Sequence, residues 1–589
     1  MGWEGWYAIA VTCMSFGVLA LTRTSADAVM VGGLTLLLVG GVLDTEQALA
    51  GLANEGMVTV GVLYVVVAGI RDTGGINWIV HTVLGRPRSI SHAQLRLMSP
   101  VAVMSMFLNN TPVVGMFIPA ASDWARRHQI SISRLMIPLS YASIAGGVCT
   151  LIGTSTNLVV NGMLIQETGS AGLSMFEIAW IGIPLTVLVF LFVLLGNRWL
   201  LPDRVPVISR YHNAREYTVE MLVDDDGVLD GKTVEEAGLR NLPGLFLMEI
   251  DRNGRIIPAV SSRDVIYSGD RLVFAGVVES VIDLQKIKGI KPASNQVYKL
   301  DVAHSERILV EAVVSKSCPL VGRTVRAGRF RNVYNAAIIA VGRNGRRVTQ
   351  KIGDIVLQPG DTLLLEGHRS FFEQQRNSRD FFLVSEVEDA TTPQHNKAAF
   401  AMAILAAMVV SVTLNWLTML EASMLAAGAM ILTGCTSGRT ARRSVDWSIL
   451  IVIAASFGFG NALQITGAAA SIAHTLIGLA AGDPLLSLGL LFAVTAMLSA
   501  LATNNAAAVI MFPIALTTAA ELGVDFMPFV IASMVAASAS FATPIGYQTN
   551  LMVFGVGGYH FSDFIRIGLP LTILAGLLTV ILVPMHWPF

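Results

Sequence analysis

The sequence predicts a polytopic α-helical membrane protein with a soluble α/β insert, and three observations predict this fold class. Of the 589 residues, 53% are hydrophobic and only 14% are charged, whereas a soluble globular protein has about 25% charged residues. Residues 203–396 hold 26 of the 40 Lys and Arg and 26 of the 41 Asp and Glu. Two apolar blocks therefore flank a charged insert, and similar polar motifs recur in both blocks.

The composition excludes a nucleic-acid-binding protein, a secreted disulfide scaffold and a single soluble enzyme. The N-terminal apolar run, 7–21, has no Lys or Arg before it, so we interpret it as a first span and not as a signal peptide. The cysteines lack metal or redox spacing and are interpreted as packing residues; they are Cys13, Cys149, Cys318 and Cys435.

Each apolar block offers five spans, because a hydrocarbon core about 30 Å thick needs roughly 20 apolar residues per helix. We expect spans near 6–22, 26–43, 56–70, 134–165 and 178–201, and near 397–417, 421–436, 447–466, 526–557 and 565–586.

Two apolar segments, 97–122 and 485–520, remain. Basic residues flank the first at both ends, and none flanks the second. Each segment is therefore expected to enter and leave on one side of the membrane as a re-entrant hairpin. The alternative, two ordinary spans, would place a basic cluster outside.

In this topology the basic residues outside the insert all fall on the cytoplasmic side, and the predicted external loops carry only acids. The predicted location is the inner (plasma) membrane, with a cytoplasmic insert and extracytoplasmic termini. We expect four parts: a first membrane half at 1–202, two insert domains at 203–300 and 301–392, and a second membrane half at 393–589.

The tips of the two hairpins resemble each other. Residues 107–120 align without a gap on 502–515, which pairs the two Asn-Asn dipeptides, and residues 150–158 align on 543–551. Five crossings per half is an odd number, so the halves are expected to be inverted relative to each other, as in many transporters. Polar non-helical backbone inside a span requires burial in protein or a wet cavity. We therefore expect the four breaks to meet at one site.

The chemistry of such a site follows from its groups. Helix halves that begin at the breaks offer free N–H groups and a positive dipole end to an anion, and neutral side-chain and carbonyl oxygens suit sodium. No carboxylate or Lys lies near a span centre, so sodium coupling is favoured over proton coupling. A single polar residue in a membrane helix commonly makes only an interhelical hydrogen bond, but the paired motifs favour a site.

The insert repeats itself at a constant spacing of 91 residues. Leu229-Asp-Gly-Lys-Thr-Val234 recurs at 320–325, and Ser268-Gly-Asp270 recurs as Pro359-Gly-Asp361. Short β-branched runs between turn residues predict two small α/β units. Because no nucleophile–base pair, phosphate loop or metal spacing is present, we expect no enzyme.

With these motifs, the membrane blocks resemble the divalent anion/sodium symporter (DASS) family of the ion transporter superfamily. The insert resembles two tandem TrkA-C (RCK-C) domains. The resemblance implies a homodimer with an elevator-type displacement of the hairpin-bearing part, two sodium sites and one substrate site. It implies a first sodium at Ser105, Asn109, Asn110 and Gly153, a second at Thr503, Asn504, Asn505 and Gly546, and substrate at Asn110, Thr111, Thr154, Asn505 and Tyr547.

The sequence also departs from that family's signatures. Ala506 lacks the hydroxyl of the family's Ser-Asn-Thr tip, and Ser155-Thr156 and Gln548-Thr549 replace its Pro-Pro pairs. Sulfate is therefore favoured over a C4-dicarboxylate as the imported divalent anion, with sodium as coupling ion and no other cofactor. The alternatives are a TrkA-C-gated ion channel or ion-flux regulator, and an oxyanion or arsenite exporter. The insert would bind a small cytosolic effector or act as a dimerisation platform.

Overall fold

The computed structural model describes residues 1–22, 24–73, 84–85, 87–128, 130–197, 199–203, 397–501 and 503–589, and, with short gaps, 218–292 and 307–386. Arg23, Arg86 and Arg198 of the predicted cytoplasmic set, and Ala502 of the second tip, lie outside these residues. The chain forms two compact units. One combines Met1–Arg204 with Thr391–Phe589, and the other is Val205–Ala390.

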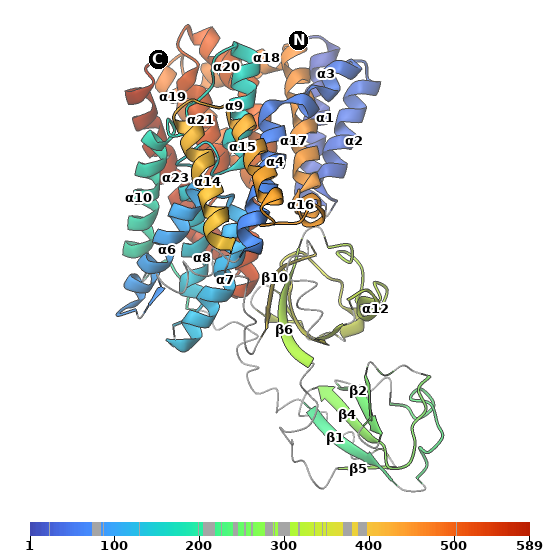
Figure 1. The fold of residues 1–589 in the computed structure, drawn as a ribbon. Helices are drawn as coiled ribbons and strands as arrows, with labels where there is room; N and C mark the ends of the chain where they lie inside the picture. Colours follow the sequence, from blue (N-terminus) through green and yellow to red (C-terminus); the bar gives the residue numbers. More distant parts are fainter. Residues whose placement is uncertain are drawn as a thin grey trace. The chain divides into compact units, whose positions relative to one another are not determined.

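The first unit is helical, and helices of both membrane halves of the sequence form it together (Figure 1). The first half contains α1 (Trp3–Leu21), α2 (Ala26–Val39), α3 (Thr45–Leu49), η1 (Ala50–Ala53), α4 (Glu55–Asp72), α6 (Ile90–Phe107), α7 (Asn110–Arg127), α8 (Ser133–Gly147), α9 (Ser155–Thr168) and α10 (Ala179–Gly196). The second half contains α14 (Ala398–Thr413), α15 (Met419–Leu432), α16 (Gly438–Ser444), α17 (Trp447–Ile465), α18 (Ala468–Leu479), α19 (Pro484–Leu501), α20 (Asn504–Leu522), α21 (Met527–Ser538), α22 (Gln548–Val556) and α23 (Phe561–His586).

Many of these helices have membrane-spanning character. In the described part of the chain, six helical segments are long and apolar enough to cross a membrane: Thr45–Asp72, Ala179–Gly196, Trp447–Ile465, Pro484–Leu501, Asn504–Leu522 and Phe561–His586. On α10, the apolar side chains of Ile183, Val187 and Leu191 are each more than half exposed. An exposed apolar stripe of this kind suits contact with lipid and not with water.

The four expected breaks are present. The segment 97–122 divides into α6 and α7, and 485–520 divides into α19 and α20. The span expected at 134–165 is interrupted between α8 and α9, and that at 526–557 between α21 and α22. One helix, α18, was not predicted, because its 12 residues are too few to span a bilayer.

Equivalent helices of the two halves pack in equivalent pairs. α6 packs on α8 and α19 on α21, while α2 packs on α17 and α4 on α15. Small residues allow the closest of these contacts. An added Cβ at Gly146 of α8 would lie 2.3 Å from the carbonyl oxygen of Ala102 on α6, so the two backbones approach to a distance that no larger side chain permits.

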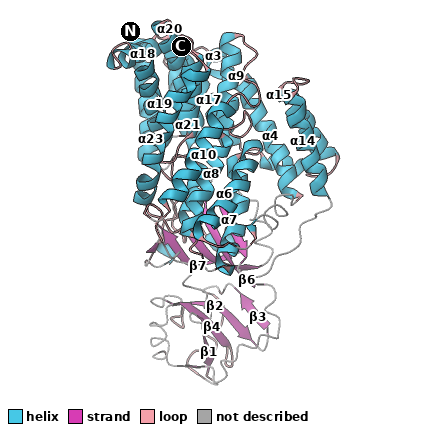
Figure 2. Cartoon of the chain, turned by 90° about the vertical axis from the view of Figure 1, so that its left-hand side faces the viewer, coloured by secondary structure: helices cyan, strands magenta, loops and turns pink. Residues whose placement is uncertain are grey.

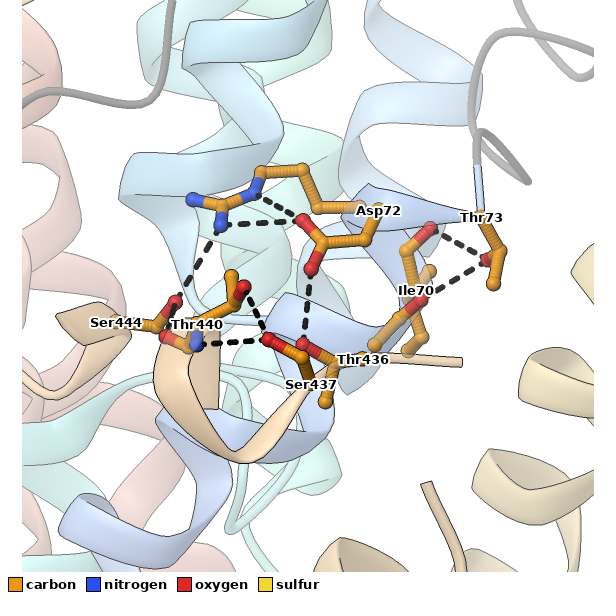
Figure 3. Close-up of polar contacts among 9 residues, drawn as sticks. Ile70, Asp72, Thr73, Thr436, Ser437, Thr440 and Ser444 are labelled. Carbon is orange, nitrogen blue, oxygen red and sulfur yellow. Dashed lines mark hydrogen bonds and ion pairs between the residues drawn. The ribbon is translucent and has the colours of Figure 1, made fainter. Parts of the chain in front are cut away.

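A polar cluster ties the C-terminal end of α4 to α16 and to the segment before it (Figure 3). Asp72 accepts a hydrogen bond from Thr436 Oγ1 at 2.9 Å and pairs with Arg71 at 3.3 Å. Arg71 Nη2 also donates to Ser444 Oγ at 3.3 Å. The cluster joins positions more than 360 residues apart in the chain, and so connects the two halves of the membrane unit.

The second unit contains two five-stranded antiparallel sheets, drawn as magenta strands in Figure 2. The first sheet has the order β3-β2-β4-β1-β5 and the second β10-β6-β9-β7-β8. Their strands are β1 (Thr218–Val223), β2 (Leu245–Arg252), β3 (Arg255–Pro258), β4 (Arg271–Gly276), β5 (Ile290–Pro292), β6 (Arg307–Val314), β7 (Ala336–Arg343), β8 (Arg346–Arg347), β9 (Thr362–His368) and β10 (Phe381–Glu386).

The 91-residue repeat of the sequence recurs in these sheets. Arg252 pairs with Asp270 and Arg343 pairs with Asp361, and the isolated bridge Thr233–Val265 recurs as Thr324–Val356. The expectation of α/β units is met mainly by strands. In the described part of the insert, the helical elements are α12 (Phe330–Tyr334) and the 3-10 turn η5 (Ile352–Asp354).

Candidate functional site

The four breaks of the membrane unit meet through hydrogen bonds between the two halves. Asn110, the first residue of α7, donates through Nδ2 to the Tyr547 hydroxyl at 2.6 Å, and this hydroxyl lies 3.3 Å from Thr154 Oγ1. Thr154 and Tyr547 precede α9 and α22 in extended backbone, and neither side chain caps its helix. The predicted substrate residues Asn110, Thr154 and Tyr547 therefore lie together.

Two further contacts join each hairpin tip to the broken helix of the other half. Thr111 Oγ1 of α7 donates to Gln548 Oε1 of α22 at 2.9 Å. Ser155 Oγ and Thr156 Oγ1 of α9 both donate to Asn505 Oδ1 of α20 at 3.1 Å. All five side chains are buried or half-buried in the membrane unit.

The arrangement brings four helix N-termini to one place. α7, α9, α20 and α22 begin at Asn110, Ser155, Asn504 and Gln548, and the hydrogen bonds above link residues of all four first turns. First-turn N–H groups have no partner within their own helix, and the helix dipole adds positive potential there. Chemically, the site suits an anion that accepts hydrogen bonds.

A first group of oxygen atoms lies beside the first hairpin tip. Ser105 Oγ donates to Asn110 Oδ1 and lies 2.8 Å from Ser143 Oγ. Gly153 packs so closely that an added Cβ would lie 2.8 Å from the Ser105 carbonyl oxygen and 2.5 Å from that of Gly147. Of the predicted sodium residues, Ser105, Asn110 and Gly153 are thus together. Asn109 Oδ1 instead accepts the Thr111 amide at 3.3 Å in a local turn.

A second group of oxygen atoms lies beside the second tip. Ser499 Oγ lies within hydrogen-bond distance of two acceptors, Asn504 Oδ1 at 3.0 Å and the Ala537 carbonyl oxygen at 2.7 Å. An added Cβ at Gly546 would lie 2.4 Å from Ser540 Oγ, so Gly546 also packs against a hydroxyl. The predicted residue Thr503 instead caps α20, because its Oγ1 accepts the Ala506 amide at 3.3 Å.

Sequence reasoning missed Ser143 and Ser499. Ser143 lies within an apolar run of α8, where an isolated serine resembles a residue that bonds only to its own helix. A signal for Ser499 was present, because Ser499 precedes Asn504 by the same five residues that separate Ser105 from Asn110.

These hydrogen bonds correct the alignment of the two tips by one residue. Ser105 with Asn110 corresponds to Ser499 with Asn504, whereas the gapless alignment paired Asn110 with Asn505. A second contact agrees with the correction. The Thr150 hydroxyl donates to the Met106 carbonyl, and the Thr543 hydroxyl donates to the Ala500 carbonyl.

The correction changes the comparison with the family signature. Thr503-Asn504-Asn505 now corresponds to Asn109-Asn110-Thr111, and Asn505 occupies the position of Thr111. Ala506 corresponds to Pro112, so the lack of a hydroxyl at Ala506 no longer argues for a particular anion. The earlier alignment was wrong because two adjacent asparagines match equally well in either register.

The side chains that meet at the four breaks are amides and hydroxyls, which carry no formal charge. In the described part of the chain, no group of three or more His, Cys, Asp or Glu side chains is placed to hold a metal ion. The two groups of oxygen atoms therefore consist of hydroxyls, amide oxygens and carbonyls, which are donors of the kind that coordinate hard cations.

Comparison with known proteins identifies the family. The citrate transporter family matches residues 16–536 and 462–589, more than half of the chain. The chain belongs to the citrate transporter family. A Chlamydomonas reinhardtii protein, whose name refers to a regulator of the sulfur deprivation response, is 37% identical to this citrate transporter family member over 570 residues. The alignment covers 94% of this chain and 97% of the relative.

Other relatives of this citrate transporter family member carry transporter names. Sodium/sulfate cotransporter 2 of Chlamydomonas reinhardtii is 30% identical, covering 97% of this chain and 88% of the relative. The sodium-dependent dicarboxylate transporter SdcS of Staphylococcus aureus is 28% identical over 34% of this chain and 40% of the relative. The predicted resemblance to divalent anion/sodium symporters is confirmed, and the citrate transporter family member is a multi-pass membrane protein.

Proposed function

We propose that the protein is a sodium-coupled symporter that imports sulfate. The observation that carries this proposal is the meeting of four helix N-termini through Asn110, Tyr547, Thr154 and the two contacts between halves. Their N–H groups favour an anion, and similarity to named sodium/sulfate cotransporters over nearly the whole chain supports sulfate.

Sulfate is favoured over a C4-dicarboxylate for two reasons. Similarity to the dicarboxylate transporter SdcS covers about a third of the chain, whereas similarity to the sodium/sulfate cotransporters covers nearly all of it. In addition, Gln548 stands in a break where the family's signature has a proline, and its side-chain NH2 group suits a compact oxyanion that only accepts hydrogen bonds.

We assign the two coupling sodium ions to the two groups of oxygen atoms. The first group contains Ser105, Asn110, Ser143 and the Gly147 and Gly153 backbone, and the second contains Ser499, Asn504, Ser540 and the Gly546 backbone. These sets keep Ser105, Asn110, Gly153, Asn504 and Gly546. They leave out Asn109 and Thr503, whose side chains serve local turns, and Asn505, whose Oδ1 accepts hydrogen bonds from Ser155 and Thr156. Sodium at both places would order the tips and add positive charge beside the anion.

We propose an elevator-type alternating access from an asymmetry in packing. α17 packs on α20, but the equivalent helices α4 and α7 are not among the closely packed pairs of the described helices. α4 packs on α9 instead. An exchange of these contacts, with α4 on α7 and α17 on α22, would move the hairpins past a scaffold of α1–α4 and α14–α17. The second tip is closed against the scaffold in this state, so we infer a site that opens to the cytoplasm.

The remaining parts of the proposal concern assembly and regulation. The protein acts as a homodimer in the inner (plasma) membrane, with both termini extracytoplasmic and the insert in the cytoplasm. The two repeated sheets serve as TrkA-C-like domains that bind a small cytosolic effector. The even spread of acids and arginines over the insert sequence suits a solvated surface of this kind.

The proposal is tested by counterflow in proteoliposomes loaded with unlabelled sulfate or succinate. We expect radiolabelled sulfate to exchange against internal sulfate only when sodium is present, and succinate to exchange much more slowly. Asn110→Ala is expected to abolish exchange, because its amide joins the substrate site to the first oxygen group. Sodium-independent exchange, or faster exchange of succinate, would contradict the proposal.

A further inference from the structure

The two contacts between a hairpin tip and the broken helix of the other half both join an amide to hydroxyl groups, but the tip supplies the hydroxyl in one contact and the amide in the other. Each joins a side-chain amide to hydroxyl groups: Gln548 to Thr111, and Asn505 to Ser155 and Thr156. In the corrected alignment Thr111 corresponds to Asn505, and the first residue of α9, Ser155, corresponds to the first residue of α22, Gln548. One hairpin tip thus supplies the hydroxyl and the other tip supplies the amide.

The direction of these hydrogen bonds decides which groups remain for a ligand. A hydroxyl has one proton, and an amide has an acceptor oxygen and an NH2 group with two protons. The hydroxyls of Thr111, Ser155 and Thr156 donate to amide oxygens. Because an oxyanion only accepts hydrogen bonds, these hydroxyls have no proton left for it, whereas both amide NH2 groups do.

Both NH2 groups are available in the described part of the chain. Neither Gln548 Nε2 nor Asn505 Nδ2 donates a hydrogen bond to a described protein group. Neither atom is among the fully buried side-chain polar atoms that have no hydrogen-bond partner. Gln548 is half-buried and is the first residue of α22, so its amide lies next to the free N–H groups of that helix. The site thus offers backbone and side-chain donors together.

We propose that Gln548 and Asn505 form a pair of NH2 donors for the divalent oxyanion, and that Thr111, Ser155 and Thr156 position them. The inference rests on the proposed sulfate transport and names a specificity residue, Gln548. At this position the family signature has a proline, which offers no side-chain donor. Thr111, expected from the family to contact substrate, instead acts through Gln548.

Three variants test the proposal in reconstituted full-length protein. Gln548→Glu keeps an acceptor for Thr111 but replaces the NH2 donor with a negative charge, so sulfate uptake is expected to fall below a hundredth of wild type. Gln548→Ala removes one donor to a charged ligand and is expected to raise the KM for sulfate about 10- to 100-fold. Thr111→Val is expected to raise the KM less, about 3- to 10-fold, with kcat nearly unchanged.

The double variant Thr111→Val/Gln548→Ala separates positioning from direct contact. If Thr111 acts through Gln548, the double variant has the same KM as Gln548→Ala, and the sodium half-saturation concentration, measured at saturating sulfate, stays at the wild-type value in all of them. Gln464→Ala serves as the matched control, because Gln464 is exposed on α17 and donates to Glu167 away from the breaks.

The outcomes distinguish this inference from the function on which it rests. Sodium-dependent sulfate uptake by the wild type, with an unchanged sulfate KM in Gln548→Ala and Gln548→Glu, would overturn the role of Gln548 alone. Absence of sodium-dependent sulfate uptake by the wild type would overturn both. Additive effects of Thr111→Val and Gln548→Ala would show that Thr111 contacts the anion independently.

Discussion

At the scale of single residues, the site depends on partners that are distant in the chain. Asn110 bonds Tyr547, and Thr111 bonds Gln548, each across 437 residues. The serines Ser105 and Ser499 are fully buried and bond the asparagines that begin α7 and α20. A buried hydroxyl that lies beside an amide oxygen and a carbonyl is well placed to join a sodium coordination shell.

We predict that Ser105→Ala and Ser499→Ala each raise the sodium concentration for half-maximal sulfate uptake. The loss of one neutral oxygen ligand should cost about 1–2 kcal/mol, or about 5- to 30-fold in sodium affinity. Uptake measured against sodium concentration checks this. Ser423→Ala is the control, because Ser423 is equally buried on α15 but bonds only the Leu420 carbonyl among the described contacts. An unchanged sodium dependence in both variants would contradict the assignment of the oxygen groups.

At the scale of elements, each sheet of the insert is joined by a buried arginine–aspartate pair. The Asp361 side chain is 1% exposed. It accepts hydrogen bonds from Arg343 Nε and Nη2 at 2.7 Å and from the Gln358 backbone N–H at 2.8 Å. Arg343 Nη2 also donates to the Val356 carbonyl at 2.7 Å. In the first sheet, hydrogen bonding by Asp270 raises the pKa of the Arg252 guanidinium. The pair therefore connects β7 to the turn before β9, and its counterpart connects β2 to the turn before β4.

We predict that Asp361→Ala destabilises the second sheet by about 2–4 kcal/mol, because it leaves a partly buried guanidinium and a backbone N–H without their acceptor. The change in the free energy of unfolding is measured by denaturing the full-length protein chemically and monitoring hydrogen exchange in the insert. Asp354→Ala is the control, because Asp354 pairs with Arg326 on the surface, with 57% and 65% of the side chains exposed. An exposed pair contributes little, so equal effects of the two substitutions would contradict this account.

At the scale of the whole membrane unit, transport requires the hairpins to move against the scaffold. The contact between α17 and α20 is close enough to cross-link: a Cβ added at Gly460 would lie 3.4 Å from the Val509 carbonyl oxygen and 3.9 Å from its Cγ1. The scaffold helices α4 and α15 approach as closely, since a Cβ added at Gly69 would lie 3.2 Å from the Met430 Cβ. The two contacts differ only in whether the proposed movement breaks them.

We predict that oxidation of Gly460→Cys/Val509→Cys stops sulfate uptake and that a reductant restores it, in a background without the four native cysteines. A disulfide holds its Cβ atoms about 4 Å apart, so it would prevent the hairpin from leaving α17. The pair Gly69→Cys/Met430→Cys lies within the scaffold and should support uptake after oxidation. Full activity of the first pair when it is quantitatively cross-linked would contradict the elevator displacement.

The sequence predicted the breaks but not the pairs that they form. Asn-Asn and Gly-Thr-Ser-Thr-Asn stretches interrupt apolar runs, and such polar backbone in a span is costly unless it is buried in protein, so these positions stood out. Ser143 did not stand out, because a serine in an apolar helix has no distinguishing pattern, and the spacing that marks Ser499 was hidden because the gapless alignment paired Ser105 with Ala500. The one-residue shift between the two tips was also not predicted, because Asn504 and Asn505 are both asparagines and either of them can be aligned with Asn110.

The sequence by itself determined the class of this protein. The apolar runs, the charged insert, its 91-residue repeat and the four interruptions all follow from local composition and spacing. The tertiary structure decided which hydroxyl meets which amide: Thr111 with Gln548, and Ser155 with Asn505. The reason is physical. Apolar burial requires only that a segment be apolar and long enough, whereas a hydrogen bond requires two particular atoms within about 3 Å, and only the packing of distant helices sets that distance.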